Sequence, residues 1–330
     1  MKQSAVIKGL GFHVPERILS NKDLEQLVET SDEWITSRSG IKTRHVVSEG
    51  ESLTDLSHGA ALKALDDAGL SPEAITHILV ATFSPESYIP SAACALQDRL
   101  GLRGRVAYDI SAACTGFLYA LENARAILAL HPESKILVCS GDVVTSRVNW
   151  EDRATCVLFG DGCGAAVVAA EDGGPHRAVI RDVSLASDGA LGDLLTIRGG
   201  GSGRHYRLGE PIGEDFFVQM QGREVFKHAV RSMTEVCNGL LERHGLTTDD
   251  VDMLLPHQAN LRIIEAVGKK LGIPGERVFI NVDKYGNTSA ASVPIALSEA
   301  VHGGSVQPGQ RVLLTAFGGG FTWGACLLDF

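Results

Sequence analysis

Three potentially reactive side chains occur in distinctive local sequences. Cys114 lies in Ala-Ala-Cys-Thr-Gly-Phe, His257 in Pro-His-Gln-Ala-Asn, and Asn287 in Tyr-Gly-Asn-Thr-Ser-Ala-Ala-Ser. A thiolate can form an acyl-thioester, and an imidazole and an amide can donate hydrogen bonds to the negative charge that a decarboxylation leaves behind. The trio therefore indicates thioester chemistry, provided that the fold brings the three side chains together.

The surroundings of Cys114 distinguish it from the other cysteines. The segment that follows it, residues 115–130, is apolar on nearly every face and predicts a buried helix. A cysteine at a helix N-terminus meets unpaired backbone N–H groups, which stabilise a thiolate. The remaining cysteines lie in apolar helix or strand patterns and are assigned to packing: Cys94, Cys139, Cys156, Cys163, Cys237 and Cys326.

His257 and Asn287 are weak candidates when each is considered alone. A single histidine after an apolar strand is more often structural than catalytic, and we assign no role to the other ten histidines. Asn287 in Gly-Asn-Thr-Ser is typical of a turn or a helix cap. Their assignment as catalytic residues depends on where the fold places them.

Composition limits the classes of protein that the chain can belong to. With 330 residues, 44% of them hydrophobic and 21% charged, it is long enough for one large or two medium domains with a sizeable core. The seven cysteines lack a regular spacing, so a disulfide framework is not expected, and no Cys-x-x-Cys or His-x-x-x-His pair indicates a metal. We see no apolar run that predicts a signal peptide or membrane span, and we expect a cytoplasmic location. The net charge of -10 disfavours nonspecific binding to nucleic acid or anionic lipid.

The order of predicted elements is repeated along the chain. The first half predicts helix 53–68, strand 77–83, helix 90–101, strand 105–110, a helix from 114 and strand 135–140. The second half predicts helix 225–244, strand 252–255, helix 261–271, strand 277–281, a helix after 287 and strand 311–315. The simplest interpretation is two copies of one α/β unit, residues 1–172 and 173–330.

The duplication also relates two of the reactive residues. Cys114 and Asn287 are 173 positions apart, and both fall at the start of the same predicted helix of their half. Ligands in α/β sheets usually bind at strand ends. A twofold arrangement of the two units is therefore expected to bring both helix starts toward one central site.

The chain resembles the β-ketoacyl-acyl carrier protein synthase III family, the initiating condensing enzymes of type II fatty-acid synthesis in the thiolase superfamily. The similarity runs from Gly9-Leu-Gly-Phe-His-Val-Pro and Ser31-Asp-Glu-Trp-Ile, through the His257 and Asn287 strings, to Phe317-Gly-Gly-Gly-Phe-Thr-Trp-Gly. A His and Asn pair separates this family from the elongating synthases, which use two histidines, and from thiolases, which add a second cysteine. The resemblance implies a thiolase-like, duplicated αβαβα layered fold.

The resemblance also implies a two-stage reaction. Cys114 would take the acyl group of acetyl-CoA or another short acyl-CoA, and malonyl-acyl carrier protein would then lose carbon dioxide. His257 and Asn287 would stabilise the resulting enolate, while the backbone N–H groups of Cys114 and Gly319 would hold the oxyanion on the acyl carbon. Both thioesters are substrates, and no resident cofactor is implied.

Binding residues follow from the same resemblance. Trp34 and Arg153 would sandwich the adenine of CoA, and Arg38 would lie near its phosphates. The pantetheine tunnel would be lined by Gly222, Phe226, Ala259 and Asn260. The surface that docks the acidic acyl carrier protein would contain Lys227, Arg262, Lys269 and Lys270. Arg262 and Lys269 are seven apart and share a helix face. Taken singly, Trp34 also fits an amphipathic anchor and Gly222 a turn. The charged residues also fit solvated surface side chains.

The acyl pocket is expected to involve Phe317 and Ile89. The family often carries Phe where this chain has Ile89, at a dimer-interface position that closes the pocket of the neighbouring subunit. A homodimer is therefore implied. Acetyl-CoA is the first expectation for the primer, with propionyl, branched and longer groups left open.

Three other functions are compatible with parts of the sequence. A related thiolase-fold acyltransferase of secondary metabolism would use the same residues. A Cys-His-Asn hydrolase shares their chain order, but the papain-like pattern places Cys-Gly-Ser-Cys-Trp near the mature N-terminus. A noncatalytic scaffold is disfavoured because all three reactive residues are present. Acylation of Cys114 and a carbon-extended product would distinguish the synthase from each of these.

Overall fold

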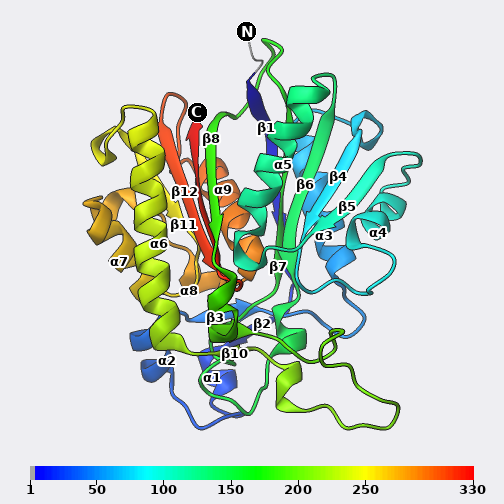
Figure 1. The fold of residues 1–330 in the computed structure, drawn as a ribbon, viewed down its shortest axis with the longest axis vertical. Helices are drawn as coiled ribbons and strands as arrows, with labels where there is room; N and C mark the ends of the chain where they lie inside the picture. Colours follow the sequence, from blue (N-terminus) through cyan, green and yellow to red (C-terminus); the bar gives the residue numbers. More distant parts are fainter. Residues whose placement is uncertain (1–3) are drawn as a thin grey trace.

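The computed structural model describes residues 4–330, and within them the largest sheet has nine strands (Figure 1). Their order is β11-β12-β13-β8-β1-β7-β6-β4-β5. The strands are β1 (Ala5–His13), β4 (His77–Ala81), β5 (Val106–Ile110), β6 (Lys135–Asp142), β7 (Gly162–Ala170), β8 (Ala178–Ser187), β11 (Met253–Pro256), β12 (Arg311–Gly318) and β13 (Thr322–Asp329). Small two-stranded sheets pair β2 (Ile18–Ser20) with β3 (Thr43–His45) and β9 (Leu195–Thr196) with β10 (Gln219–Met220).

The pairing pattern of the large sheet is repeated on either side of the β1–β8 pair. On one side β7 and β6 pair antiparallel, followed by parallel β4 and β5. On the other side β13 and β12 pair antiparallel, followed by parallel β11. The predicted strand 277–281 is wrong as a strand, since only a parallel bridge from Leu254 to Val278 stands at that place. The predicted boundary at residue 172 falls in the connection between β7 and β8.

Helices cover both faces of the sheet and also fill the space between its two halves (Figure 1). In the middle, α5 (Gly116–Leu130) and α9 (Ser292–His302) contact strands of both halves. The outer helices are α3 (Leu53–Asp67) and α4 (Ala92–Arg99) on one side, and α6 (Gly222–Arg243) and α7 (Leu261–Leu271) on the other. Shorter helices are α1 (Asn21–Leu24), α2 (Asp32–Ser39) and α8 (Val282–Tyr285). The result is the expected αβαβα layering.

Three hydrophobic clusters hold these layers together. The central one joins α5 and α9 to the sheet, through residues such as Phe117, Leu121 and Leu297. The other two lie under the outer helices, one beneath α3 and α4 and one beneath α6 and α7. Because α5 is packed on several sides, its nearly continuous apolar sequence is explained by its central position. Within residues 4–330, no helix combines the length and apolarity that crossing a bilayer requires.

The duplication has a different register at the reactive residues from the one predicted. Ala113 and Ser289, 176 positions apart, have positive φ angles of 45° and 52°, and each lies in a single 3₁₀ turn before a central helix. In this register Cys114 corresponds to Ala290, and Asn287 comes earlier in its own half. The helix predicted from residue 114 begins two residues later, at Gly116, as α5, and the helix predicted after residue 287 begins at Ser292, as α9.

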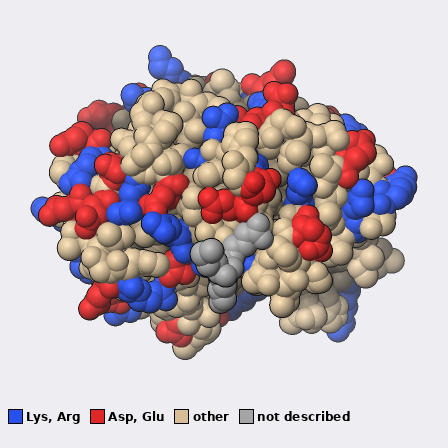
Figure 2. All heavy atoms as spheres, turned by 90° about the horizontal axis from the view of Figure 1, so that it is seen from above, with Lys and Arg blue, Asp and Glu red and all other residues tan. Residues whose placement is uncertain are grey.

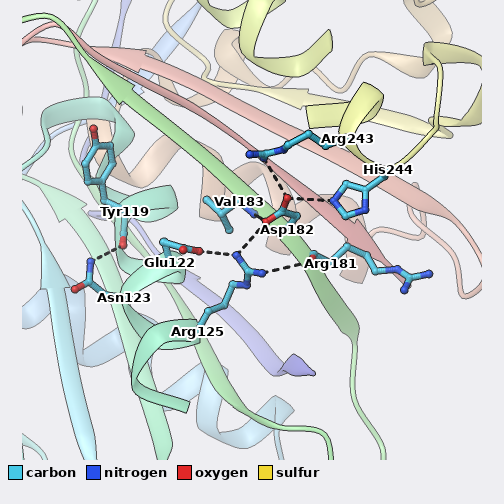
Figure 3. A network of polar contacts seen from close by, with 9 residues as sticks. All are labelled: Tyr119, Glu122, Asn123, Arg125, Arg181, Asp182, Val183, Arg243 and His244. Atoms are coloured by element: carbon cyan, nitrogen blue, oxygen red, sulfur yellow. Dashed lines mark hydrogen bonds and ion pairs between the residues drawn. The ribbon is translucent and has the colours of Figure 1, made fainter. Parts of the chain in front are cut away.

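A polar network at β8 ties the central layer to an outer helix (Figure 3). Asp182 accepts from Arg125 of α5 at 3.3 Å and from His244, just beyond α6, at 3.1 Å, and it pairs with Arg243 at 3.1 Å. Burial raises the pKa of Asp182, but the His244 hydrogen bond and the charges of Arg243 and Arg125 lower it further, so the net pKa is below the ordinary value. The network is therefore expected to stabilise the fold while this carboxylate is ionised.

Asp182→Asn is expected to lower the free energy of unfolding by about 1–3 kcal/mol at pH 7, since it weakens hydrogen bonds between charged groups. A depressed native pKa contributes stability that is complete above the unfolded carboxyl pKa of about 3.9 and is lost as the pH falls through the native value. Urea unfolding between pH 7 and pH 3 should show the difference shrinking at acid pH. Asp172→Asn, at an exposed pair with Lys8, is the control and should have little effect. A pH-independent difference would contradict this account.

The surface is mixed in charge. Figure 2 shows basic and acidic side chains interspersed over the face seen from above, without a broad area of one sign. That face offers no extended basic patch of the kind that nonspecific nucleic-acid binding uses.

Candidate active site

The three reactive residues lie on the wall of one cavity. Its volume is about 1260 Å³, and Cys114, His257 and Asn287 all line it. Other residues singled out from the sequence also line this cavity: Phe317, Gly319, Gly222, Phe226, Lys227, Ala259, Asn260 and Arg262. The cavity therefore collects parts of both halves of the chain.

Cys114 is fixed by tight turns of backbone around it. It lies in the 3₁₀ turn Ala113–Thr115 ahead of α5, and its Sγ is 3.4 Å from Ser289 Oγ. Gly318, at the end of β12, packs directly on it: a Cβ at Gly318 would be 2.6 Å from the Cys114 backbone nitrogen. A side chain at that position would displace the nucleophile, so the close approach requires glycine.

The resting form of Cys114 differs from the sequence-based expectation. Burial raises the pKa of the Cys114 thiol to about 12, the Ser289 hydrogen bond lowers it, and the negative charge of Asp142 raises it. The expected stabilisation of a thiolate by a helix N-terminus is outweighed by this removal from water. Cys114 is therefore a thiol at neutral pH, and its proton must leave when the sulfur attacks.

His257 is a neutral imidazole anchored on one side. It directly follows β11 and is 3% exposed, and burial lowers its pKa to about 4. Its Nδ1 is hydrogen-bonded to Ser292 Oγ, which also accepts from the backbone N–H of Gln258 at 3.3 Å. Gln258 donates to that oxygen, and donation of the Ser292 hydroxyl proton to Nδ1 would place the ring proton on Nε2. The imidazole can thus donate a hydrogen bond without carrying a charge.

Asn287 is oriented by backbone and side-chain contacts. Its N–H donates to Leu158 O at 2.8 Å, and its carbonyl accepts from Gly160 N at 3.1 Å. Its Oδ1 accepts from the backbone N–H of Ser289 at 2.9 Å. With Oδ1 engaged, the Nδ2 group is the part of the amide that can donate to a ligand in the cavity.

The predicted adenine site lies apart from the cavity wall. Trp34 and Arg38 belong to α2, and the guanidinium carbons of Arg153 and Arg38 lie 4.9 Å and 5.5 Å from the Trp34 ring centroid. The shorter distance is a direct cation–π contact, so an adenine could enter between Trp34 and Arg153 only after Arg153 moves. Asn260 connects this region to the cavity, since it caps α7 and donates to Arg38 O at 3.2 Å.

The predicted docking and acyl-pocket residues divide into two groups. Lys227 and Arg262 line the cavity, whereas Lys269 and Lys270 lie in the last turn of α7 away from its wall. Phe317 is buried and lines the cavity. Ile89 is 89% exposed and does not line the cavity of its own chain.

Sequence reasoning missed three polar residues next to the trio. Ser289 and Ser292 stood in the string that contains Asn287, and the repeated small residues there were the available signal. Asp142, the last residue of β6, gave no such signal. Its wholly buried carboxylate became apparent only in the folded chain.

The fold and this cavity define a condensing enzyme of the thiolase-like class. Residues 108–189 match the family model "3-oxoacyl-[acyl-carrier-protein] synthase III", and residues 241–330 match the model of its C-terminal part. The chain belongs to the β-ketoacyl-[acyl-carrier-protein] synthase III family.

Individual relatives cover the whole chain. A β-ketoacyl-[acyl-carrier-protein] synthase III of Oleidesulfovibrio alaskensis is 58% identical over 99% of both chains. The solved structure of the synthase III from Aquifex aeolicus is 45% identical and covers 99% of this chain and 100% of its own, with a TM-score of 0.89. That from Pseudomonas aeruginosa is 36% identical, with coverages of 99% and 98% and a TM-score of 0.90. These similarities confirm the expected fold class and the expected acyltransferase class.

Proposed function

We propose that the protein initiates fatty-acid synthesis by condensing a short acyl-CoA, acetyl-CoA first, with malonyl-acyl carrier protein. The observation that carries this proposal is the placement of Cys114, His257 and Asn287 on one cavity wall. The names of the full-length relatives support the same reaction.

In the first half-reaction, Cys114 attacks the acyl-CoA carbonyl and CoA leaves. The oxyanion on the acyl carbon accepts hydrogen bonds from the backbone N–H groups of Cys114 and Gly319. The pantetheine arm lies along Gly222, Phe226, Ala259 and Asn260, with its nucleotide near Trp34, Arg38 and Arg153.

In the second half-reaction, malonyl-acyl carrier protein loses carbon dioxide beside the acylated cysteine. The enolate oxygen accepts hydrogen bonds from His257 Nε2 and Asn287 Nδ2, and the enolate carbon attacks the acyl group on Cys114. A neutral histidine suits this role, because it can donate a hydrogen bond to the enolate oxygen without transferring its proton to the enolate.

The same proposal includes the assembly and location of the enzyme. We place it in the cytoplasm as a homodimer, in which the exposed Ile89 closes the acyl pocket of the partner. No resident cofactor is needed, because acyl-CoA and malonyl-acyl carrier protein bring the reacting groups. Sedimentation velocity tests the assembly, and a monomer at micromolar concentration would contradict it.

A panel of primers tests the proposed reaction. Acetyl-, propionyl-, isobutyryl- and octanoyl-CoA would each be incubated with malonyl-acyl carrier protein, and the products on the carrier identified by mass. We expect a 3-oxoacyl chain two carbons longer than the primer, with acetyl-CoA used best. Transfer of the primer to an alcohol or amine without chain extension would instead indicate an acyltransferase of secondary metabolism.

Arg262→Glu combined with Lys269→Glu is expected to raise the KM for malonyl-acyl carrier protein about tenfold, because an acidic partner would meet two reversed charges. Loading of Cys114 by acetyl-CoA should stay unchanged. Arg103→Glu, an exposed reversal beyond α4 in the opposite outer layer, is the control. Steady-state kinetics with each substrate varied separately provide the measurement, and an unchanged KM for the carrier substrate would reject this docking surface.

A further inference from the structure

A buried carboxylate lies behind the nucleophile and has no role in the reaction described above. Asp142 is 0% exposed. Its Oδ1 accepts from Thr82 Oγ1 at 2.8 Å, from Phe83 N at 2.9 Å and from Ser84 Oγ at 2.9 Å. Its Oδ2 accepts from Ala290 N at 3.2 Å. These partners are all neutral donors, which is an expensive arrangement for an ionised group.

Ser289 lies between this carboxylate and the reactive thiol. Its Oγ is 3.4 Å from Cys114 Sγ, the next residue's N–H, Ala290 N, donates to Asp142 Oδ2 at 3.2 Å, and the Ser289 side chain is one of the groups that lower the pKa of Asp142. The φ angle of 52° at Ser289 is uncommon for a residue with a side chain. The bond from its backbone N–H to Asn287 Oδ1 supports this conformation. The strained turn thus places the Ser289 hydroxyl beside the thiol and on the side of the turn where Asp142 lies.

We infer that Asp142, acting through Ser289, takes up the proton that Cys114 loses when it attacks acyl-CoA. This inference rests on the proposed function. As the bond from sulfur to the acyl carbon forms, the Cys114 proton passes to Ser289 Oγ and the Ser289 hydroxyl proton passes to the Asp142 carboxylate. When the bond from the acyl carbon to CoA breaks, both shifts reverse, and Ser289, which lines the cavity, delivers a proton to the departing CoA sulfur. No net proton is gained or lost.

Acylation requires a group that accepts the Cys114 proton, and the relay supplies one. Burial raises the pKa of the Cys114 thiol to about 12, so a preformed thiolate is scarce at pH 7. His257, with a pKa of about 4, is a weak proton acceptor. Burial raises the pKa of Asp142 above the usual carboxyl value, although its hydrogen bonds act in the opposite direction. The raised pKa makes the Asp142 carboxylate a better proton acceptor than His257.

The charge of Asp142 alone would have the opposite effect on Cys114. A nearby anion raises the pKa of the thiol, so removing it should favour the thiolate. Two other titratable groups lie nearby: His257 lines the same cavity as Cys114, and the charge of Asp142 raises the pKa of Asp161. Asp161 is also 0% exposed, but it accepts its hydrogen bonds from Thr145 and Val47. Asp161→Asn is therefore a matched control.

The test measures the single-turnover rate of Cys114 acylation by acetyl-CoA, by mass, from pH 6 to pH 9. Wild type should be nearly independent of pH. Asp142→Asn and Ser289→Gly should be at least tenfold slower at pH 7, and their rates should rise about tenfold per pH unit because they depend on preformed thiolate. Ser289→Gly suits the positive φ and leaves the four other hydrogen bonds of Asp142 in place. A spectroscopic titration of the Cys114 thiol should show a lowered pKa in Asp142→Asn despite its slower acylation.

Two outcomes would overturn the relay. One is an Asp142→Asn enzyme that is acylated as fast as wild type or faster, as charge removal alone predicts. The other is read on wild type without any variant: two protons in motion should give a curved dependence of rate on the deuterium fraction of the solvent, and a straight line would reject the relay. If wild type is not acylated at Cys114 at all, the proposed function itself fails, so the two failures are distinguishable.

Discussion

His257→Ala and Asn287→Ala are each expected to lower the rate of condensation by on the order of a hundredfold or more, while Cys114 is still acylated by acetyl-CoA. Each change removes one donor to the enolate oxygen and leaves the backbone N–H groups that serve the acylation step. Acylation measured by mass, and carbon dioxide release from malonyl-acyl carrier protein, report the two half-reactions separately.

The double variant extends this prediction. Both donors bind the same oxygen, so their effects on the rate should not be independent. The double variant should be slower than either single variant, but its fold-decrease in rate should be smaller than the product of the two single fold-decreases. His244→Ala, in the network at Asp182, is the control and should condense normally. If both half-reactions fell equally in each single variant, the division of labour between the trio would be wrong.

Cys114→Ala is expected to show the opposite pattern. Without a sulfur to carry the acyl group, formation of the 3-oxoacyl product should fall by on the order of a thousandfold or more. Decarboxylation of malonyl-acyl carrier protein should persist, since His257 and Asn287 remain in place. Release of labelled carbon dioxide and product formation would be followed in the same sample.

Cys94→Ala provides the comparison for this variant. Cys94 is a partly exposed thiol on α4, outside the cavity lining, and its loss should leave both activities near those of wild type. Equal loss of decarboxylation in Cys114→Ala would mean that the cysteine also positions the malonyl group.

Local sequence was sufficient to predict several elements. The helix 261–271 was predicted with its observed bounds, and Gly272, with a φ of 74°, ends it. The helix predicted from residue 53 begins there as α3, behind a capping box of Ser52 and Asp55. Both cases depend on side chains that act within one turn of the backbone, so neighbouring residues determine them.

Other features depend on residues that only the folded chain brings together. Asp142 and Ser289 are far apart in sequence, and the contacts of Ser289 with Cys114 and of Ala290 with Asp142 join the two halves of the chain. The state of the thiol was mispredicted for the same reason, since the depth of burial decides the pKa and a local helix-start pattern does not show it. The register of the duplication differs by three residues because α5 begins two residues after Cys114, whereas α9 begins five residues after Asn287.

The order of events at Cys114 tests the account most directly. Wild-type protein would be mixed with acetyl-CoA alone, quenched, and mapped by peptide mass, then chased with malonyl-acyl carrier protein. We expect one acetyl group on Cys114, released during the chase as a four-carbon 3-oxoacyl chain on the carrier with loss of carbon dioxide. An unmodified Cys114, or an acetyl group that the chase does not convert into the extended product, would contradict the proposed function.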